Sequence, residues 1–156
     1  MQTRRRINSF SLAALGFTTA VAVLGVSGCS MMDTQSSLVA MTTQLRGANE
    51  VPAVALAGTG SVDAVFNKQS NLLRWKLNYA GLSGPATAGH FHGPAAVGAN
   101  AGVALGWANP VTNGMDGSAT LTAAQAADLL AGKWYANIHT AANPGGEIRG
   151  QMTVRN

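Results

Sequence analysis

GSVDAVFNKQSNLLRWKLNY, residues 60–79, alternates between apolar and polar side chains on either side of the polar segment NKQS. A repeat of two residues is typical of a β-strand that is buried on one face only. The apolar positions are Val62, Ala64 and Phe66 in the first half and Leu73, Trp75, Leu77 and Tyr79 in the second. The stretch therefore predicts an antiparallel hairpin with one face in a core.

The register of this hairpin follows if NKQS is its connection. The expected pairs are Val62 with Trp75 and Ala64 with Leu73 inside, and Asp63 with Arg74 outside. A slip by one residue would turn every apolar side chain toward solvent, so the alternation itself fixes which face is buried.

A second hairpin is predicted near the C-terminus, from KWYANIH (133–139) and EIRGQMTV (147–154). With His139 opposite Glu147, one face is apolar and contains Trp134, Ala136, Ile138, Ile148, Gly150 and Met152. The other face carries Tyr135, Asn137, His139, Glu147, Arg149 and Gln151. The simplest interpretation of Glu147 and Arg149 is a solvated or cross-strand ion pair.

The segments between the two hairpins complete the fold class. GVALGWAN (102–109) and DGSATL (116–121) are expected to be strands. TAAQAADLLAG (122–132) predicts one short helix, with Thr122 as N-cap, Gln125 completing a capping box and Gly132 just past the end. The domain is therefore predicted to be all-β, an antiparallel Greek-key-like β-sandwich or barrel with one short helix.

The N-terminus has the pattern of an export signal. Arg4, Arg5 and Arg6 precede an apolar run over residues 10–26, and small residues follow. The sequence VSGC at the end of this run resembles the lipobox of bacterial lipoproteins, and it contains the only cysteine, Cys29. We expect residues 1–28 to be a lipoprotein signal peptide, 29–37 to be the lipidated cysteine and a tether, and 38–156 to be the β domain.

The lipobox resemblance implies a location and one partner. Lipidation of Cys29 would hold the domain on a membrane in the cell envelope without a spanning helix, and Ser30 after the cysteine favours the outer membrane if the host has one. Removal of the three arginines leaves seven basic and six acidic residues, because the full chain has ten and six. A net charge of +1 with no basic stripe argues against nucleic acid as a partner.

GHFHGPA (89–95) and LLAGKWYANIHTAANPGGEIRGQ (129–151) resemble the CHRD domain, first described as a repeat in chordin and found in many exported bacterial proteins. The resemblance runs from about Thr42 to Val154, and it implies an exported β domain without an established catalytic activity. A weaker similarity, to copper-zinc superoxide dismutase, rests on the His-x-His pair His90 and His92. That enzyme's two metals need more than the three histidines present here, so a complete dinuclear site is excluded.

The histidines allow two interpretations. Side chains at i and i+2 of a strand point to the same side, so His90 and His92 could share one copper or zinc ion with His139. Glu147 is the candidate for a further ligand, and Asn137, Thr140 and Arg149 are candidates for the hydrogen bonds that orient the ligands. Alternatively, the same residues form a structural or partner-binding polar cluster.

No catalytic constellation accompanies these residues. The sequence contains no phosphate-binding loop, nucleophile elbow or HExxH motif, and a single cysteine rules out CxxC. We therefore expect a non-catalytic binding or interaction module with an unidentified envelope or extracellular partner. The alternative function is a mononuclear copper or zinc protein with dismutase-like redox chemistry.

Overall fold

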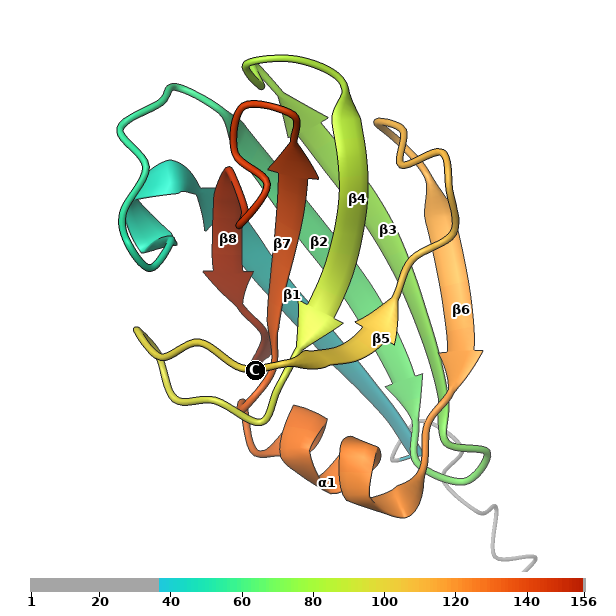
Figure 1. Ribbon diagram of the computed structural model, residues 1–156. Helices are drawn as coiled ribbons and strands as arrows, with labels where there is room; N and C mark the ends of the chain where they lie inside the picture. The colour runs from blue at the N-terminus through green and yellow to red at the C-terminus, as the bar shows by residue number, and fades with distance from the viewer. Residues whose placement is uncertain (1–36, 156) are drawn as a thin grey trace, which may run out of the picture. The chain divides into compact units, whose positions relative to one another are not determined.

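The computed structural model describes residues 37–155 (Figure 1), so the predicted signal peptide and the lipidated Cys29 lie outside the described residues. These residues form strands and two short helical segments. In chain order they are β1 (Leu38–Arg46), the 3-10 turn η2 (Gly47–Asn49), β2 (Thr59–Asn67), β3 (Leu72–Ala80), β4 (Ala86–His92), β5 (Val103–Gly106), β6 (Asp116–Thr120), α1 (Ala123–Leu130), β7 (Tyr135–Thr140), β8 (Ile148–Gln151) and β9 (Thr153–Val154).

The strands form one antiparallel sheet in the order β5-β4-β7-β8-β1-β2-β3-β6, with β9 alongside β1. The sheet folds back on itself, so that β4, β7 and β8 lie in front of β1, β2 and β3 in Figure 1. The two halves are joined between β8 and β1, where the ladder consists of the single pair Arg46 and Arg149. Next to this pair, a Cβ on Gly150 would collide with the backbone carbonyl of Gln44, so only glycine allows the two strands to approach this closely. The expected all-β class is confirmed.

The core lies between the two halves. Both inner faces contribute large apolar side chains, among them Phe66, Leu77, Phe91, Trp134 and Ile138, each at most 1% exposed. Trp75 packs edge-on against Phe91 at 5.3 Å between ring centroids, which connects the two halves at the centre of the core. Trp75 and Trp134 are therefore inward, as predicted, and Arg74 is exposed on the outer face.

The first hairpin has the predicted faces but not the predicted register. Ala64 pairs with Trp75, and Val65 with Arg74, so the partners are shifted by two residues from those expected. The reason is a connection displaced by one residue, KQSN (68–71) in place of NKQS (67–70). Asn67 is still paired, with Leu72, and its side chain accepts hydrogen bonds from the backbone amides of Gln69 and Ser70. Asn71, at φ 53°, closes this turn in the left-handed region that asparagine tolerates.

The other predicted elements are present. In the C-terminal hairpin, Ile138 pairs with Ile148 and Asn137 with Arg149, which is the expected register. Helix α1 has the predicted capping box between Thr122 and Gln125. None of the helices in residues 37–155 combines the length and the apolar character that crossing a membrane would need.

The contact between Gly89 and Trp107 gives a first prediction. A Cβ at Gly89 would overlap the Trp107 indole, and Trp107 is only 7% exposed. We expect Gly89→Ala to lower the free energy of unfolding by about 1–3 kcal/mol because the packed ring must move. Urea unfolding followed by tryptophan fluorescence measures this change.

Gly84→Ala is the matched control. A Cβ at Gly84 would meet nothing within 4 Å, and we expect the free energy of unfolding to change by less than about 0.5 kcal/mol. Equal losses in the two variants would contradict the packing argument.

Candidate metal centre

Three histidines from two neighbouring strands converge on the outer side of β4 and β7. His90 and His92 project from β4, and His139 projects from β7, where Asn137 is the ladder partner of His90. One potential ligand nitrogen from each ring lies within 4.8 Å of the others. The structure thus brings together the three residues that the sequence nominated, although they are up to 49 positions apart along the chain.

Two backbone carbonyls fix the tautomers of two of these rings. His92 Nδ1 lies 3.0 Å from the Ala101 carbonyl oxygen, and His139 Nδ1 lies 2.9 Å from that of Pro144. Because a carbonyl only accepts hydrogen bonds, each Nδ1 donates, and each Nε2 is left with a lone pair. Metal-binding histidines characteristically donate their other N–H to a carbonyl or carboxylate in this way.

The remaining nitrogens face one another. Without an ion, His90 Nδ1 donates a hydrogen bond of 3.0 Å to His139 Nε2. This separation is close to the distance of about 3.3 Å between the ligands of a tetrahedral zinc ion when the zinc–nitrogen distance is about 2.0 Å. His92 Nε2 is buried and has no hydrogen-bond partner. A buried nitrogen lone pair without a partner calls for an explanation, and a metal ion directed at it is one.

The environment keeps two of the rings neutral. Burial, reinforced by the neighbouring His139 and His92, lowers the pKa of His90. Burial also lowers the pKa of His139, against the hydrogen bond to Pro144 that raises it. Imidazole binds a metal only in its neutral form, so both shifts favour ligation near neutral pH.

A stack of side chains supports His92 from one side. The Tyr135 ring lies parallel to the His92 ring, at 4.9 Å between centroids and an interplanar angle of 4°. The guanidinium carbon of Arg149 lies 3.4 Å from the centroid of the Tyr135 ring. Arg149 also donates hydrogen bonds to the Ala99 carbonyl and the Asn100 side chain, which attaches the loop 93–102 over the site.

Glu147 is not among the residues brought to the histidines. Its carboxylate accepts hydrogen bonds from the Ser83 amide and hydroxyl, the Thr140 hydroxyl and the Asn143 amide. Burial alone would raise the pKa of Glu147, but these hydrogen bonds together hold it below its usual value. Thr140 likewise donates to Glu147 and not to a histidine ring.

One further expectation about this face needs correction. Glu147 and Arg149 are 0% and 2% exposed, and no ion pair joins them among residues 37–155, so the solvated-pair interpretation is wrong. The loops 93–102 and 141–147 cover this face. The alternation of side chains in the strands does not predict this, because it does not show where the loops lie. Asn137 is buried, and its side-chain oxygen has no hydrogen-bond partner in the described part of the chain.

Glu50 is a buried acid beside this site that sequence reasoning missed. It is 7% exposed, and one carboxyl oxygen has no hydrogen-bond partner. Burial raises the pKa of Glu50 to about 7, although the charge of Arg149 and the backbone amide of Val51 lower it. It lies in an irregular segment with neither strand nor helix periodicity, so nothing in the sequence pattern predicted that it would be buried.

The raised pKa of Glu50 predicts a pH-dependent stability. The folded protein binds this proton more tightly than the unfolded chain, whose carboxyl has the ordinary pKa of 4.5. The contribution of Glu50 to stability is therefore fully present below about 4.5 and is lost as the pH rises to about 7. We expect Glu50→Gln to be more stable than the wild type at pH 8 by up to about 3 kcal/mol, and to be close to it at pH 4.5.

Unfolding free energies of both proteins at the two pH values test this expectation. His90 and His139 titrate in both proteins, so their contribution cancels when the unfolding free energies of the two proteins are subtracted at the same pH. A difference that is the same at pH 4.5 and pH 8 would contradict the assignment.

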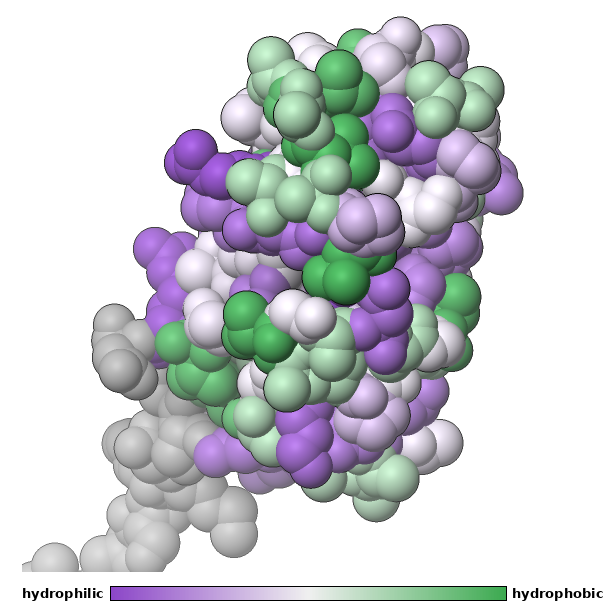
Figure 2. All heavy atoms as spheres, turned by 60° about the vertical axis from the view of Figure 1, so that its left-hand side comes forward, coloured by the Kyte–Doolittle hydropathy of each residue, from purple (hydrophilic) through white to green (hydrophobic). Residues whose placement is uncertain are grey.

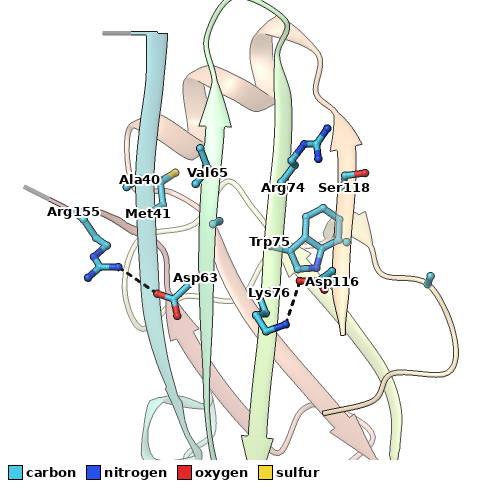
Figure 3. A pocket seen from close by; sticks show the side chains of 13 residues that line it. Ala40, Met41, Asp63, Val65, Arg74, Trp75, Lys76, Asp116, Ser118 and Arg155 are labelled. Atoms are coloured by element: carbon cyan, nitrogen blue, oxygen red, sulfur yellow. Dashed lines mark hydrogen bonds and ion pairs between the residues drawn. The ribbon is translucent and has the colours of Figure 1, made fainter. Parts of the chain in front are cut away.

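The other half of the sheet has a shallow hollow of about 700 Å³ on its solvent side. Figure 3 shows two ion pairs among its side chains, Arg155 with Asp63 and Lys76 with Asp116. These residues are more than half exposed, so the pairs contribute little. On the face drawn in Figure 2, hydrophobic residues occur in small groups separated by polar ones. The buried histidine cluster is therefore the stronger candidate for a functional site.

Comparisons with known proteins add one finding. A scan against protein families matches residues 41–152 to the CHRD domain. Neither a search of curated proteins nor a search of solved structures finds a match. The matched segment contains His90, His92 and His139, together with the strands that hold them.

Proposed function

Because the chain belongs to the CHRD domain family, we propose that it is a binding module of the cell envelope whose three histidines hold one copper or zinc ion. Binding without catalysis is the favoured role. It agrees with the absence of a nucleophile motif or close carboxylate pair in the sequence. Membership of the family supports the fold and the role as a binding module. The proposal of a metal ion depends on the geometry of the three histidines.

One observation carries the metal proposal. His92 Nε2 is buried without a partner, on a ring whose Nδ1 is already committed to the Ala101 carbonyl. A structural polar cluster would be expected to satisfy that nitrogen with a donor, whereas a metal site leaves its lone pair available. Three imidazoles are a ligand set that suits zinc and copper, with a further position available to water.

Calorimetric titration of the purified full chain with Zn(II), and with copper under reducing and oxidising conditions, tests the proposal. We expect one ion per chain with a dissociation constant below micromolar, and weaker binding as the pH falls through the histidine range. The copper-loaded protein should consume superoxide no faster than the same concentration of free copper. Failure to bind either metal would leave the polar-cluster interpretation, and protein-specific turnover would favour the dismutase-like alternative.

The location in the envelope is a separate part of the proposal. Its support is the sequence alone, VSGC after an apolar run with three arginines before it. We expect Cys29→Ser to leave the membrane fraction and to lose the mass of the attached lipid, because the acyl chains are the anchor. Fractionation with detergent extraction and intact-mass measurement check this result, and a variant that stays in the membrane with unchanged mass would contradict it.

A further inference from the structure

The ligand set of the proposed site carries no negative charge. Among residues 37–155, the group able to hold a metal consists of His90, His92 and His139, with no aspartate or glutamate. The carboxylate of Glu147, which is close in sequence, is engaged by Ser83, Thr140 and Asn143. A bound ion would therefore keep its full formal charge, because neutral imidazoles do not offset it.

A buried cation lies behind one of the ligands. Arg149, Tyr135 and His92 form a continuous stack, and they are 2%, 3% and 9% exposed. No ion pair of Arg149 is present in the described part of the chain. Its guanidinium is held by neutral acceptors, the Ala99 carbonyl and the Asn100 side chain. The carboxyl facing it, Glu50, has a pKa of about 7 and so offsets the guanidinium only in part near neutral pH.

We propose that Arg149, acting through Tyr135 on His92, makes the three-histidine site selective for Cu(I) over Cu(II) and Zn(II). The inference rests on the proposed function, since it requires an ion at the histidines. Repulsion from a fixed positive charge is twice as large for a divalent ion as for a monovalent one at the same place, and it is weakly screened where water is excluded. Arg149 is thus a positioning residue for the loop 93–102 and a determinant of the charge of the ion.

Asn100→Asp is the most informative variant. Asn100 is exposed, and its side-chain oxygen lies 2.9 Å from Arg149 Nη1. The change also removes the exposed hydrogen bond from the Asn100 amide to the Val51 carbonyl, but it leaves the buried side chains of the site unchanged. The new carboxylate would neutralise the guanidinium without removing it. Arg149→Met removes the charge and keeps much of the volume, and Arg149→Lys keeps the charge but loses the planar hydrogen-bonding geometry.

The experiment measures Cu(I), Cu(II) and Zn(II) affinities of the full chain by chelator competition, together with the midpoint potential of the copper-loaded protein. We expect the wild type to bind Cu(I) more tightly than Cu(II). Asn100→Asp and Arg149→Met should each change the ratio of Cu(I) to Cu(II) affinity by about tenfold in favour of Cu(II), a shift of about 59 mV for one electron. Arg149→Lys should shift the ratio by less than half as much on the logarithmic scale.

Three results would overturn the inference. Tighter binding of Cu(II) than of Cu(I) by the wild type would show that the site is not selective in this sense, while the proposed metal site would stand. Equal shifts in Arg149→Lys and Arg149→Met, with none in Asn100→Asp, would assign the effect to packing and not to charge. A wild type that binds neither copper ion nor zinc would remove both this inference and the proposed function.

Discussion

His92→Ala is expected to weaken zinc or copper binding by about 100-fold or more. Loss of a residue that merely orients a ligand typically costs 10- to 100-fold in affinity, and among the histidines of residues 37–155 it is His92 that has a ring nitrogen buried without a partner. The change also removes the hydrogen bond to Ala101 and the ring on which Tyr135 stacks, so the loop above the site should become more mobile as well. Calorimetric titration measures the affinity and the number of ions bound.

Two comparisons make this result specific. His139→Ala should weaken metal binding by a similar factor, because the hydrogen bond to the Pro144 carbonyl orients the His139 ring as Ala101 orients that of His92. Asp63→Asn, which removes an exposed carboxylate on the other half of the sheet, should bind like the wild type. If His92→Ala retains wild-type affinity and stoichiometry, the three-histidine site does not exist.

The largest expected effect on stability is that of Glu147→Ala, a loss of about 3–5 kcal/mol in the free energy of unfolding. The carboxylate is fully buried and accepts hydrogen bonds from Ser83, Thr140 and Asn143. Its removal loses hydrogen bonds to a charged group, which contribute about 1.5–3 kcal/mol each, and it leaves the buried Thr140 hydroxyl without this acceptor, whereas water can reach the exposed Ser83. Chemical unfolding of the variant and the wild type at pH 7 measures the difference.

The pH dependence gives an independent check on Glu147. Its pKa is lower in the folded protein than the usual value, so its contribution is present above the unfolded pKa and is lost as the pH falls through the folded one. The gap between wild type and Glu147→Ala should therefore narrow in acid. Asp63→Asn is the matched control, because Asp63 is 54% exposed in its ion pair and its loss should cost less than about 1 kcal/mol. Equal losses in the two variants would contradict the buried network.

The faces of the strands could be predicted from the sequence, but one register could not. Alternation of side chains reports only which residues share a face, and a shift by two residues preserves it. The side chain of Asn67 and the left-handed conformation of Asn71 place the connection to β3 at residues 68–71 instead of 67–70, and alternation does not reveal such local preferences. The C-terminal hairpin was predicted in the right register, because placing His139 opposite Glu147 puts the apolar side chains of both strands on one face.

The candidate site was predictable in its ligands and not in its surroundings. His90 and His92 are two apart on one strand, which places them on one side, and His139 was the one remaining histidine of the sequence, on a different predicted strand. The partners that fix the rings are backbone carbonyls of Ala101 and Pro144, and a carbonyl has no signature in a sequence. Glu147 was expected to bind the metal. Its carboxylate instead accepts a hydrogen bond from the hydroxyl of Ser83, a residue of the β3–β4 connection whose position beside Glu147 the sequence does not reveal.

The position of β8 between β7 and β1 sets an order of events as the chain is made. His90 and His92 emerge early, but β7, which carries His139, lies near the C-terminus, and β1 gains its neighbours β8 and β9 only from the last residues. The proposed ion site and the closed sheet are therefore complete only after nearly all of the chain has emerged. If the chain crosses the membrane unfolded, it cannot carry a metal ion through with it, and the ion must come from the compartment in which the protein folds.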